Sequence, residues 1–369
     1  MFKQLQRLLF GGPRKSAFRP NYFISTSGQS LERIKRLGLR TESQTMPGIL
    51  DRGRLNFPVV EEETEAPEYK PDPDFYWIIE VEPGENKFFA KEELLKIFDR
   101  EWRARFSAAV VYGYSLTTER WSYVSFDDSP ERYGRLQIGI RLLKVYEPGV
   151  GDVEGMGASA GPALAAVPDL KPERLTGYLL ELDRRMRRYP SPVIIREQES
   201  LAAAIGKARE LATIKMQFGE DFVVVLKAES LYGGVLVWDT LTDAGLRWGD
   251  GDLFNWDNYP REYGGDQFFS VWTTSSPGYF FPESIKAGQR NFQDLLFGFW
   301  IARSADPVTI FDILMETVEF CRQRLGGVVL GRDGLPFDRE RERARLIRLV
   351  EGLEAKGIRP GSDRALAIF

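Results

Sequence analysis

The chain has 369 residues, of which 43% are hydrophobic, and a formal net charge of −4 at pH 7. This length allows two or three domains with cores of ordinary size, and the acidic balance argues against general affinity for nucleic acid. There is no histidine, and the one cysteine is Cys321. Serine–histidine and cysteine–histidine catalysis, an intrachain disulfide and a thiolate cluster for zinc are therefore excluded, and a reducing, cytoplasmic compartment fits.

Residues 1–73 differ in composition from the rest of the chain, with scattered Gly, Pro, Ser and Arg followed by an acidic run at 60–68. We predict a flexible arm there. Apolar and basic residues alternate at its start, which predicts a short amphipathic helix. This helix could contact an anionic membrane weakly or dock on the protein, and no apolar run is long enough to cross a membrane. The residues expected at the membrane are Phe2, Leu5, Leu8 and Leu9.

Two stretches of the chain repeat one order of predicted elements. The first begins with a β-branched and aromatic strand at 74–81 and the second with a strand at 221–227. In each, an amphipathic helix, three strands, a helix, a short strand and a last helix follow. The two strands at the start are displaced by about 147 positions, the distance from Phe75 to Phe222, which fits two fused domains of ordinary size.

Strands that follow one another directly favour antiparallel sheets over a doubly wound parallel sheet. We therefore predict an α+β protein with two tandem split β-α-β type domains, each an antiparallel sheet backed by helices on one face. The other face of each sheet is then free to bind a short peptide or the neighbouring domain. The expected organisation is a flexible arm at 1–73, a first domain at 74–219 and a second domain at 220–369.

Two polar or glycine-rich segments invite a ligand interpretation that their context does not favour. The glycines of 149–161 have a G-x-G-x-x-x-G spacing, but Pro162 and Pro168 interrupt the following segment and no βαβ unit surrounds it, which favours a flexible insertion. The acidic residues of 250–257 lack the terminal Glu of a calcium-binding loop. We expect a turn that enters a strand, and neither a metal nor a cofactor.

The aromatic strands of the second domain predict an apolar groove. Because side chains alternate along a strand, Leu296, Gly298 and Trp300 face outward if their neighbours face the helices. An exposed Trp beside Gly makes a shallow groove suited to an amphipathic peptide, although the same surface could pack on the first domain. One face of the adjacent strand is expected to carry Phe268, Ser270, Trp272 and Thr274.

Four segments of the second domain carry a resemblance to a known family. They are the strand 222–229, the helix exit 244–250, the turn 276–280 and the sequence Leu-Gly-Gly-Val-Val-Leu at 325–330. On these segments, residues from about 221 to 357 resemble the C-terminal FtsZ-binding domain of the cell-division protein ZipA. Residues 74–219 look like a diverged second copy.

The resemblance implies a split β-α-β fold without catalysis, whose exposed sheet holds the C-terminal tail of FtsZ in a shallow apolar groove. It implies a cytoplasmic adaptor of cell division and septum formation, which could act at the inner face of the cell membrane. The positions that align with the apolar groove of the family carry Lys227, Gly251, Thr274 and Gly298. The groove would then be rebuilt from Trp272, Trp300, Leu296 and Trp256.

The leading hypothesis is a non-enzymatic, two-domain peptide-binding adaptor with the FtsZ tail as partner. The alternative is a structural or assembly protein whose two sheets pack on each other or on a larger complex, without FtsZ binding. An enzyme would need carboxylate or lysine chemistry in a pocket that the sequence does not reveal.

Overall fold

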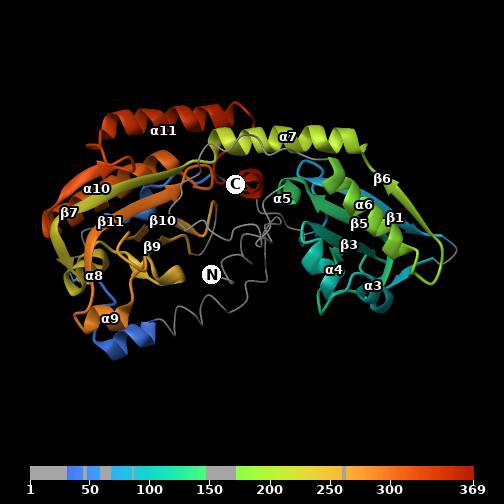
Figure 1. Cartoon of the computed structure of the whole chain (residues 1–369), viewed down its shortest axis with the longest axis horizontal. Helices are drawn as coiled ribbons and strands as arrows, with labels where there is room; N and C mark the ends of the chain where they lie inside the picture. The colour runs from blue at the N-terminus through green and yellow to red at the C-terminus, as the bar shows by residue number, and fades with distance from the viewer. Residues whose placement is uncertain (1–30, 45–47, 59–67, 85–86, 147–171, 260–262) are drawn as a thin grey trace. The chain divides into compact units, whose positions relative to one another are not determined.

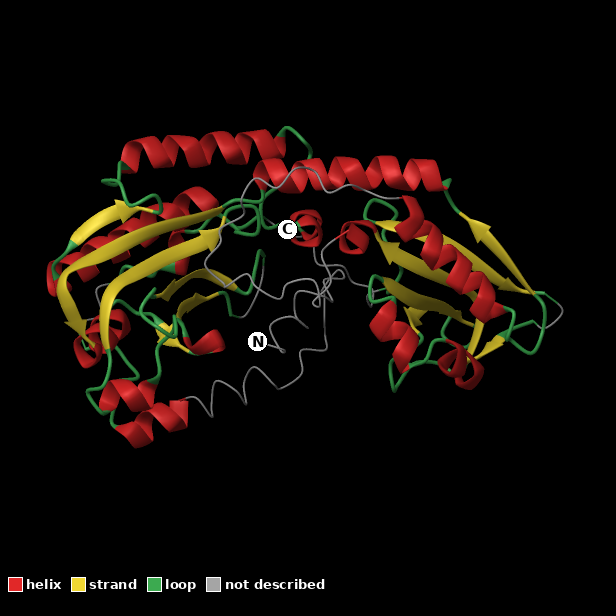
Figure 2. Cartoon of the chain, viewed as in Figure 1, coloured by secondary structure: helices red, strands yellow, loops and turns green. Residues whose placement is uncertain are grey.

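The computed structural model describes residues 31–44, 48–58, 68–84, 87–146, 172–259 and 263–369 (Figure 1). The chain divides into two compact units. The first unit comprises residues 62–217, and the second comprises residues 1–61 together with 218–367. Each unit contains one six-stranded antiparallel sheet with helices, drawn in yellow and red in Figure 2. The predicted α+β class with antiparallel sheets is confirmed.

The first unit has the strand order β4-β3-β5-β1-β6, with β2 paired to β5. The single helix predicted after the strand at 74–81 is two short helices, because Asp99 caps a new helix through its side chain. The elements are β1 (Tyr76–Pro83), β2 (Phe89–Ala90), α3 (Lys91–Ile97), α4 (Arg100–Arg105), β3 (Ala109–Ser115), β4 (Trp121–Tyr123), β5 (Arg132–Arg141), α5 (Leu142–Tyr146), α6 (Pro172–Met186), β6 (Val193–Glu197) and α7 (Leu201–Phe218).

The second unit has the strand order β12-β7-β11-β10-β9-β8. In both units the first strand in the sequence lies between the last two strands of the sheet. β1 lies between β5 and β6, and β7 lies between β11 and β12. The elements are β7 (Asp221–Gly233), α8 (Gly234–Asp243), β8 (Arg247–Trp248), η2 (Asp250–Asp252), β9 (Phe254–Asp257), β10 (Gln267–Trp272), α9 (Pro282–Lys286), β11 (Asn291–Trp300), α10 (Pro307–Leu325), β12 (Val328–Gly331), α11 (Arg339–Glu354) and α12 (Asp363–Ile368).

The core of the second unit lies between one face of its sheet and the helices α8 and α10 (Figure 1). Phe222 on β7 packs edge-on against Phe311 of α10, with ring centroids 4.9 Å apart. Leu295 and Phe297 of β11 are fully buried in the same cluster. Cys321 is also buried there, and burial raises the pKa of its thiol to about 12, so that it remains a neutral apolar side chain.

Residues of 31–44 and 48–58 pack on this core, although the sequence predicted a flexible arm over 1–73. Ile34, Leu39 and Leu55 are buried and belong to the core cluster of the second unit. The guanidinium of Arg33 donates two hydrogen bonds, of 2.6 and 2.7 Å, to the carboxylate of Glu283 on α9. We refer to residues 31–44 and 48–58 as the strap. Leu37, Ile49, Leu50 and Phe57 of the strap are partly buried against the same core.

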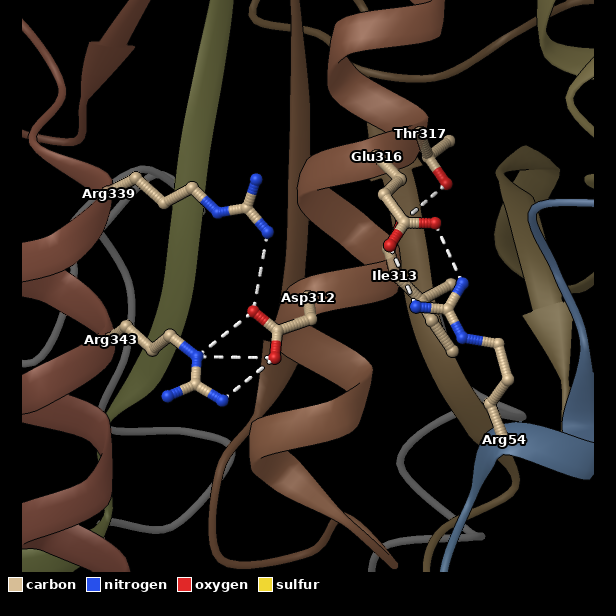
Figure 3. A network of polar contacts seen from close by, with 7 residues as sticks. All are labelled: Arg54, Asp312, Ile313, Glu316, Thr317, Arg339 and Arg343. Carbon is tan, nitrogen blue, oxygen red and sulfur yellow. Dashed lines mark hydrogen bonds and ion pairs between the residues drawn. The ribbon is translucent and has the colours of Figure 1, made fainter.

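Helix α10 holds the strap on one side and α11 on the other (Figure 3). Arg54, in the 3-10 turn η1 (Arg52–Arg54), makes a bidentate pair with Glu316 through two contacts of 2.7 Å. One turn earlier, Asp312 accepts from Arg343 at 3.0 to 3.2 Å and from Arg339 at 3.4 Å. Bidentate pairs fix orientation as well as distance, so these contacts set the position of two elements on the helix layer.

The described helices include none that is long and apolar enough to cross a membrane. The predicted membrane-contacting residues Phe2, Leu5, Leu8 and Leu9 lie outside the described residues, as does the glycine-rich segment 149–161.

The first unit contains a carboxylate, Glu181, whose ion pairs make the stability of the unit sensitive to acid. Glu181 on α6 pairs with Arg184 and with the buried Arg185, which also donates to the carbonyl of Ile97. The hydrogen bond from Arg184 is the largest cause that lowers the pKa of Glu181, and Arg185 adds to it. Together they bring this pKa from 4.5 to about 2. The ionised carboxylate therefore stabilises the folded unit above pH 4.5, and this contribution is lost as the pH falls towards about 2.

We expect Glu181→Gln to lower the midpoint of thermal unfolding of the first unit at pH 7. The difference from the unsubstituted protein should shrink as the pH falls from 4.5 to about 2, the interval between the two pKa values. Glu173→Gln, an exposed position on the same helix, is the control and should change little at any pH. A Glu181→Gln effect that is independent of pH would contradict the proposed electrostatic origin.

Candidate peptide-binding face

The face of the second sheet that points away from α8 and α10 carries an apolar strip. On β7, Phe222 and Leu226 belong to the core cluster, so that Val223, Val225 and Lys227 point to the opposite side. Gly298 and Leu296 of β11 lie directly opposite Val223 and Val225 and share their side. We refer to this side of the sheet as the open face.

A tryptophan lies over a glycine at the centre of the open face. Trp272 of β10 is paired with Leu296, and its side chain is partly buried. A Cβ atom at Gly298 would lie 2.7 Å from Cη2 of Trp272 and 3.1 Å from Cγ2 of Val223. The absence of a side chain at Gly298 therefore allows the indole of Trp272 to rest on the backbone of β11 beside Val223.

Exposed apolar side chains continue the strip to both sides of this centre. Trp300, at the end of β11, is 52% exposed and lies opposite Asp221. On the edge strand β12, Leu330 is paired with Val225 and Val328 with Lys227, and Val328 is 46% exposed. Exposed aromatic and β-branched residues that adjoin in this way are typical of interaction sites in soluble proteins.

A charged pair marks each end of the strip. At one end Lys227 lies 3.8 Å from Asp294, which also accepts from the amide of Thr274 at 2.8 Å and from its hydroxyl at 2.5 Å. At the other end Arg332 pairs at 2.6 Å with Asp221, which lies opposite Trp300 across β7 and β11. The side chains of both cations are more than 40% exposed and can pair with an acidic group of a partner as well.

Three of the predicted groove residues do not lie on the open face. Trp256 and Phe268 are buried in the core, with ring centroids 4.6 Å apart. The prediction failed for Phe268 because the pairing of β10 with β9 shifts between Gln267 and Phe269, and such an irregularity breaks the alternation of side chains. Gly251 lies outside the sheet, in the turn η2, where its φ is +72°.

Several residues of the open face were not predicted from the sequence. The predicted groove residues that lie at this face are Trp272, Thr274, Leu296, Gly298, Trp300 and Lys227. Alternation along β7, counted back from Lys227, could have identified Val223 and Val225. The neighbours of β7 on its other side depend on the pairing with β12, which the sequence does not show. The residues missed are Asp221, Val223, Val225, Asp294, Val328, Leu330 and Arg332.

The acidic segment 250–257 forms η2 and then enters β9. Among the described residues, no group of three or more carboxylate or thiol side chains is placed so that it could hold a metal ion. Asn255 of β9 instead accepts a hydrogen bond of 2.6 Å from Ser270. The chemistry that the open face offers is apolar contact with a charge at each end.

The fold and the face together define an α+β domain with one helical layer and an apolar strip on the exposed side of its sheet. Residues 221–346 match the family model of the ZipA C-terminal FtsZ-binding domain. The match confirms the resemblance predicted from 221 to 357. It does not include residues 74–219, so that a second copy there is not supported. The comparison with curated proteins gives no significant match.

Proposed function

We propose that the open face of the second unit binds the C-terminal tail of FtsZ as a short peptide. The chain would then act as a non-enzymatic adaptor in bacterial cell division, on the cytoplasmic side of the division site. The match of residues 221–346 to the FtsZ-binding family and the apolar strip around Trp272 and Trp300 support this proposal.

The strip suits a peptide with several apolar side chains on one side. Val223, Val225 and Leu296 form its floor, and Trp272 and Trp300 stand at its side and end. Large aromatic side chains of this kind contribute most of the binding free energy in small interfaces, because they remove much apolar surface from water. Lys227 and Arg332 favour acidic groups beyond the apolar segment.

We expect Trp300→Ala to weaken binding by about 2 kcal/mol, or about 30-fold in Kd. The side chain of Trp300 is half exposed at the end of β11, so its loss should leave the core of the unit intact. The measurement is fluorescence anisotropy of a labelled FtsZ C-terminal tail peptide titrated with the full chain. The full chain is used because the strap contributes to the core of the second unit.

The control is Leu236→Ala on α8, a side chain that is 48% exposed but belongs to the helix layer. This variant should bind with unchanged affinity. Equal affinities for all three proteins would remove the open face from the proposal. Absence of saturable binding by the unsubstituted chain would instead favour the structural or assembly role.

A further inference from the structure

One face of the first unit's sheet is lined by tyrosines around a glycine. Gly139 of β5 is paired with Ile78 of β1 and with Val110 of β3. A Cβ atom at this position would lie 3.1 Å from the ring of Tyr112 and 3.1 Å from the ring of Tyr76. We refer to this side of the sheet as the tyrosine face. Gly139 and Gly298 thus both lie under aromatic rings, on strands that pair with the first strand of their sheet.

The chain covers the tyrosine face with its own residues 69–71. Pro71 is buried, and a Cβ atom at Gly139 would lie only 2.7 Å from the Cβ of Pro71. The ring of Tyr69 packs on that of Tyr123, with centroids 5.2 Å apart. Tyr123 is paired with Tyr112 across β4 and β3. Burial raises the pKa of Tyr112, as expected for a phenol that this cover separates from water.

The docked segment has the features of a bound peptide. Its two inward side chains are Tyr69 and Pro71, and Lys70 between them is exposed. The amide of Tyr69 donates a hydrogen bond of 3.3 Å to the carbonyl of Trp121 on β4, the edge strand of the sheet. Alternating side-chain pockets combined with a main-chain bond to an edge strand are how sheets bind extended peptides.

The segment is distinct from the strand that follows it. The carbonyl of Asp72 accepts from the amides of Phe75 and Tyr76, at 3.1 and 3.0 Å, and this turn ends the docked segment just before β1. Residues 69–71 can therefore leave the tyrosine face without loss of a pair between β1 and its neighbours.

We propose that the tyrosine face is a peptide-binding face that residues 69–71 fill in cis, as a built-in ligand. The same sequence supplied in trans binds there once the built-in segment is disabled. On the open face of the second unit, by contrast, Trp300 and Val328 remain 52% and 46% exposed among the described residues.

A tethered segment competes at a high effective concentration, in the millimolar range for a short tether. A free peptide therefore meets little vacant face in the unsubstituted protein. The full chain with both Tyr69→Ser and Pro71→Ser retains the tether but loses the two inward side chains. This double variant should be accessible to a peptide of residues 66–75 at millimolar concentration.

The test is a titration of the ¹⁵N-labelled double variant with this peptide, followed by amide chemical shifts. We expect saturable shifts at Tyr112, Tyr123 and Gly139, and shifts at least about tenfold weaker at the same peptide concentration in the unsubstituted chain. A peptide that itself carries serine at positions 69 and 71 is the control and should cause none. Absence of shifts in the folded double variant, or equal shifts in both proteins, would overturn the proposal.

Hydrogen exchange of the unsubstituted chain gives an independent test that does not depend on the folding of the variant. The amide of Tyr69 should exchange through local opening, at least about tenfold faster than the amide of Ile138 in β5. Equal protection of the two amides would show that the segment is a permanent part of the sheet and would overturn the proposal. Neither result depends on FtsZ binding by the second unit.

Discussion

Replacement of Asp243 by alanine is expected to lower the free energy of unfolding of the second unit by about 3 to 5 kcal/mol, the cost of breaking a buried ionic network on one side. The side chain of Asp243 is 1% exposed, at the end of α8. Its carboxylate pairs with Arg324 at 2.8 Å and with Arg40 at 3.2 Å, and it accepts from the amide of Gln44 at 2.9 Å. The variant leaves two guanidinium groups and an amide without this partner.

The loss should be visible in the strap as well as in the core, since Arg40 and Gln44 join the strap to α8. The measurement is native-state hydrogen exchange at amides of β7 and β11, which reports on the second unit alone. Asp239→Ala is the matched control on the same helix. Asp239 is 23% exposed and lies 3.5 Å from Arg40, so we expect a loss of about 1 kcal/mol or less. Similar losses in the two variants would contradict the network as the cause.

The order of elements was predictable because it depends on local patterns. Alternation along Leu295–Ile301 and the helical spacing of Phe311, Leu314 and Val318 follow from the sequence alone, and both sets lie in the core of the second unit. The direct succession of strands was sufficient to favour antiparallel sheets.

The strap could not be predicted, because its partners are distant in the sequence. Arg33 and Glu283 are 250 positions apart, and Arg54 and Glu316 are 262 positions apart. Leu31, Ile34 and Leu37 have helical spacing and residues 31–37 form a helix, but a segment this short does not predict that it packs on a core. A scattered apolar residue in a polar segment is equally compatible with a flexible arm.

Part of the open face was hidden for a different reason. Alternation predicts which side chains of a strand share a face. The shift in pairing between Gln267 and Phe269 breaks this alternation and places Phe268 in the core. Val328 and Leu330 join the face only through the pairing of β12 with β7, which brings together positions about a hundred residues apart. Such a contact depends on the tertiary fold and leaves no local pattern.

The second large effect is expected for Gly327→Ala, at the start of β12. The φ of Gly327 is +95°, and a Cβ atom there would lie 2.2 Å from Oη of Tyr232 and 2.4 Å from the carbonyl oxygen of Lys227. The tyrosine hydroxyl donates to Gly326 at 2.9 Å and could shift, but the carbonyl belongs to the backbone of β7. Strain and overpacking together should cost about 3 kcal/mol.

This substitution should also weaken the proposed binding of a peptide to the open face, because it separates β12 from β7. Val328 and Leu330 would lose their places opposite Lys227 and Val225, and with them one side of the apolar strip. Gly334→Ala is the control, since Gly334 has a φ of +78° but no atom within 4 Å of the new Cβ. It should cost about 1 kcal/mol, for backbone strain alone. Hydrogen exchange at β7 measures the loss of stability, and anisotropy with the FtsZ tail peptide measures the loss of affinity. Equal stability costs for the two glycine variants would contradict a clash of the new Cβ with the backbone of β7 as the cause.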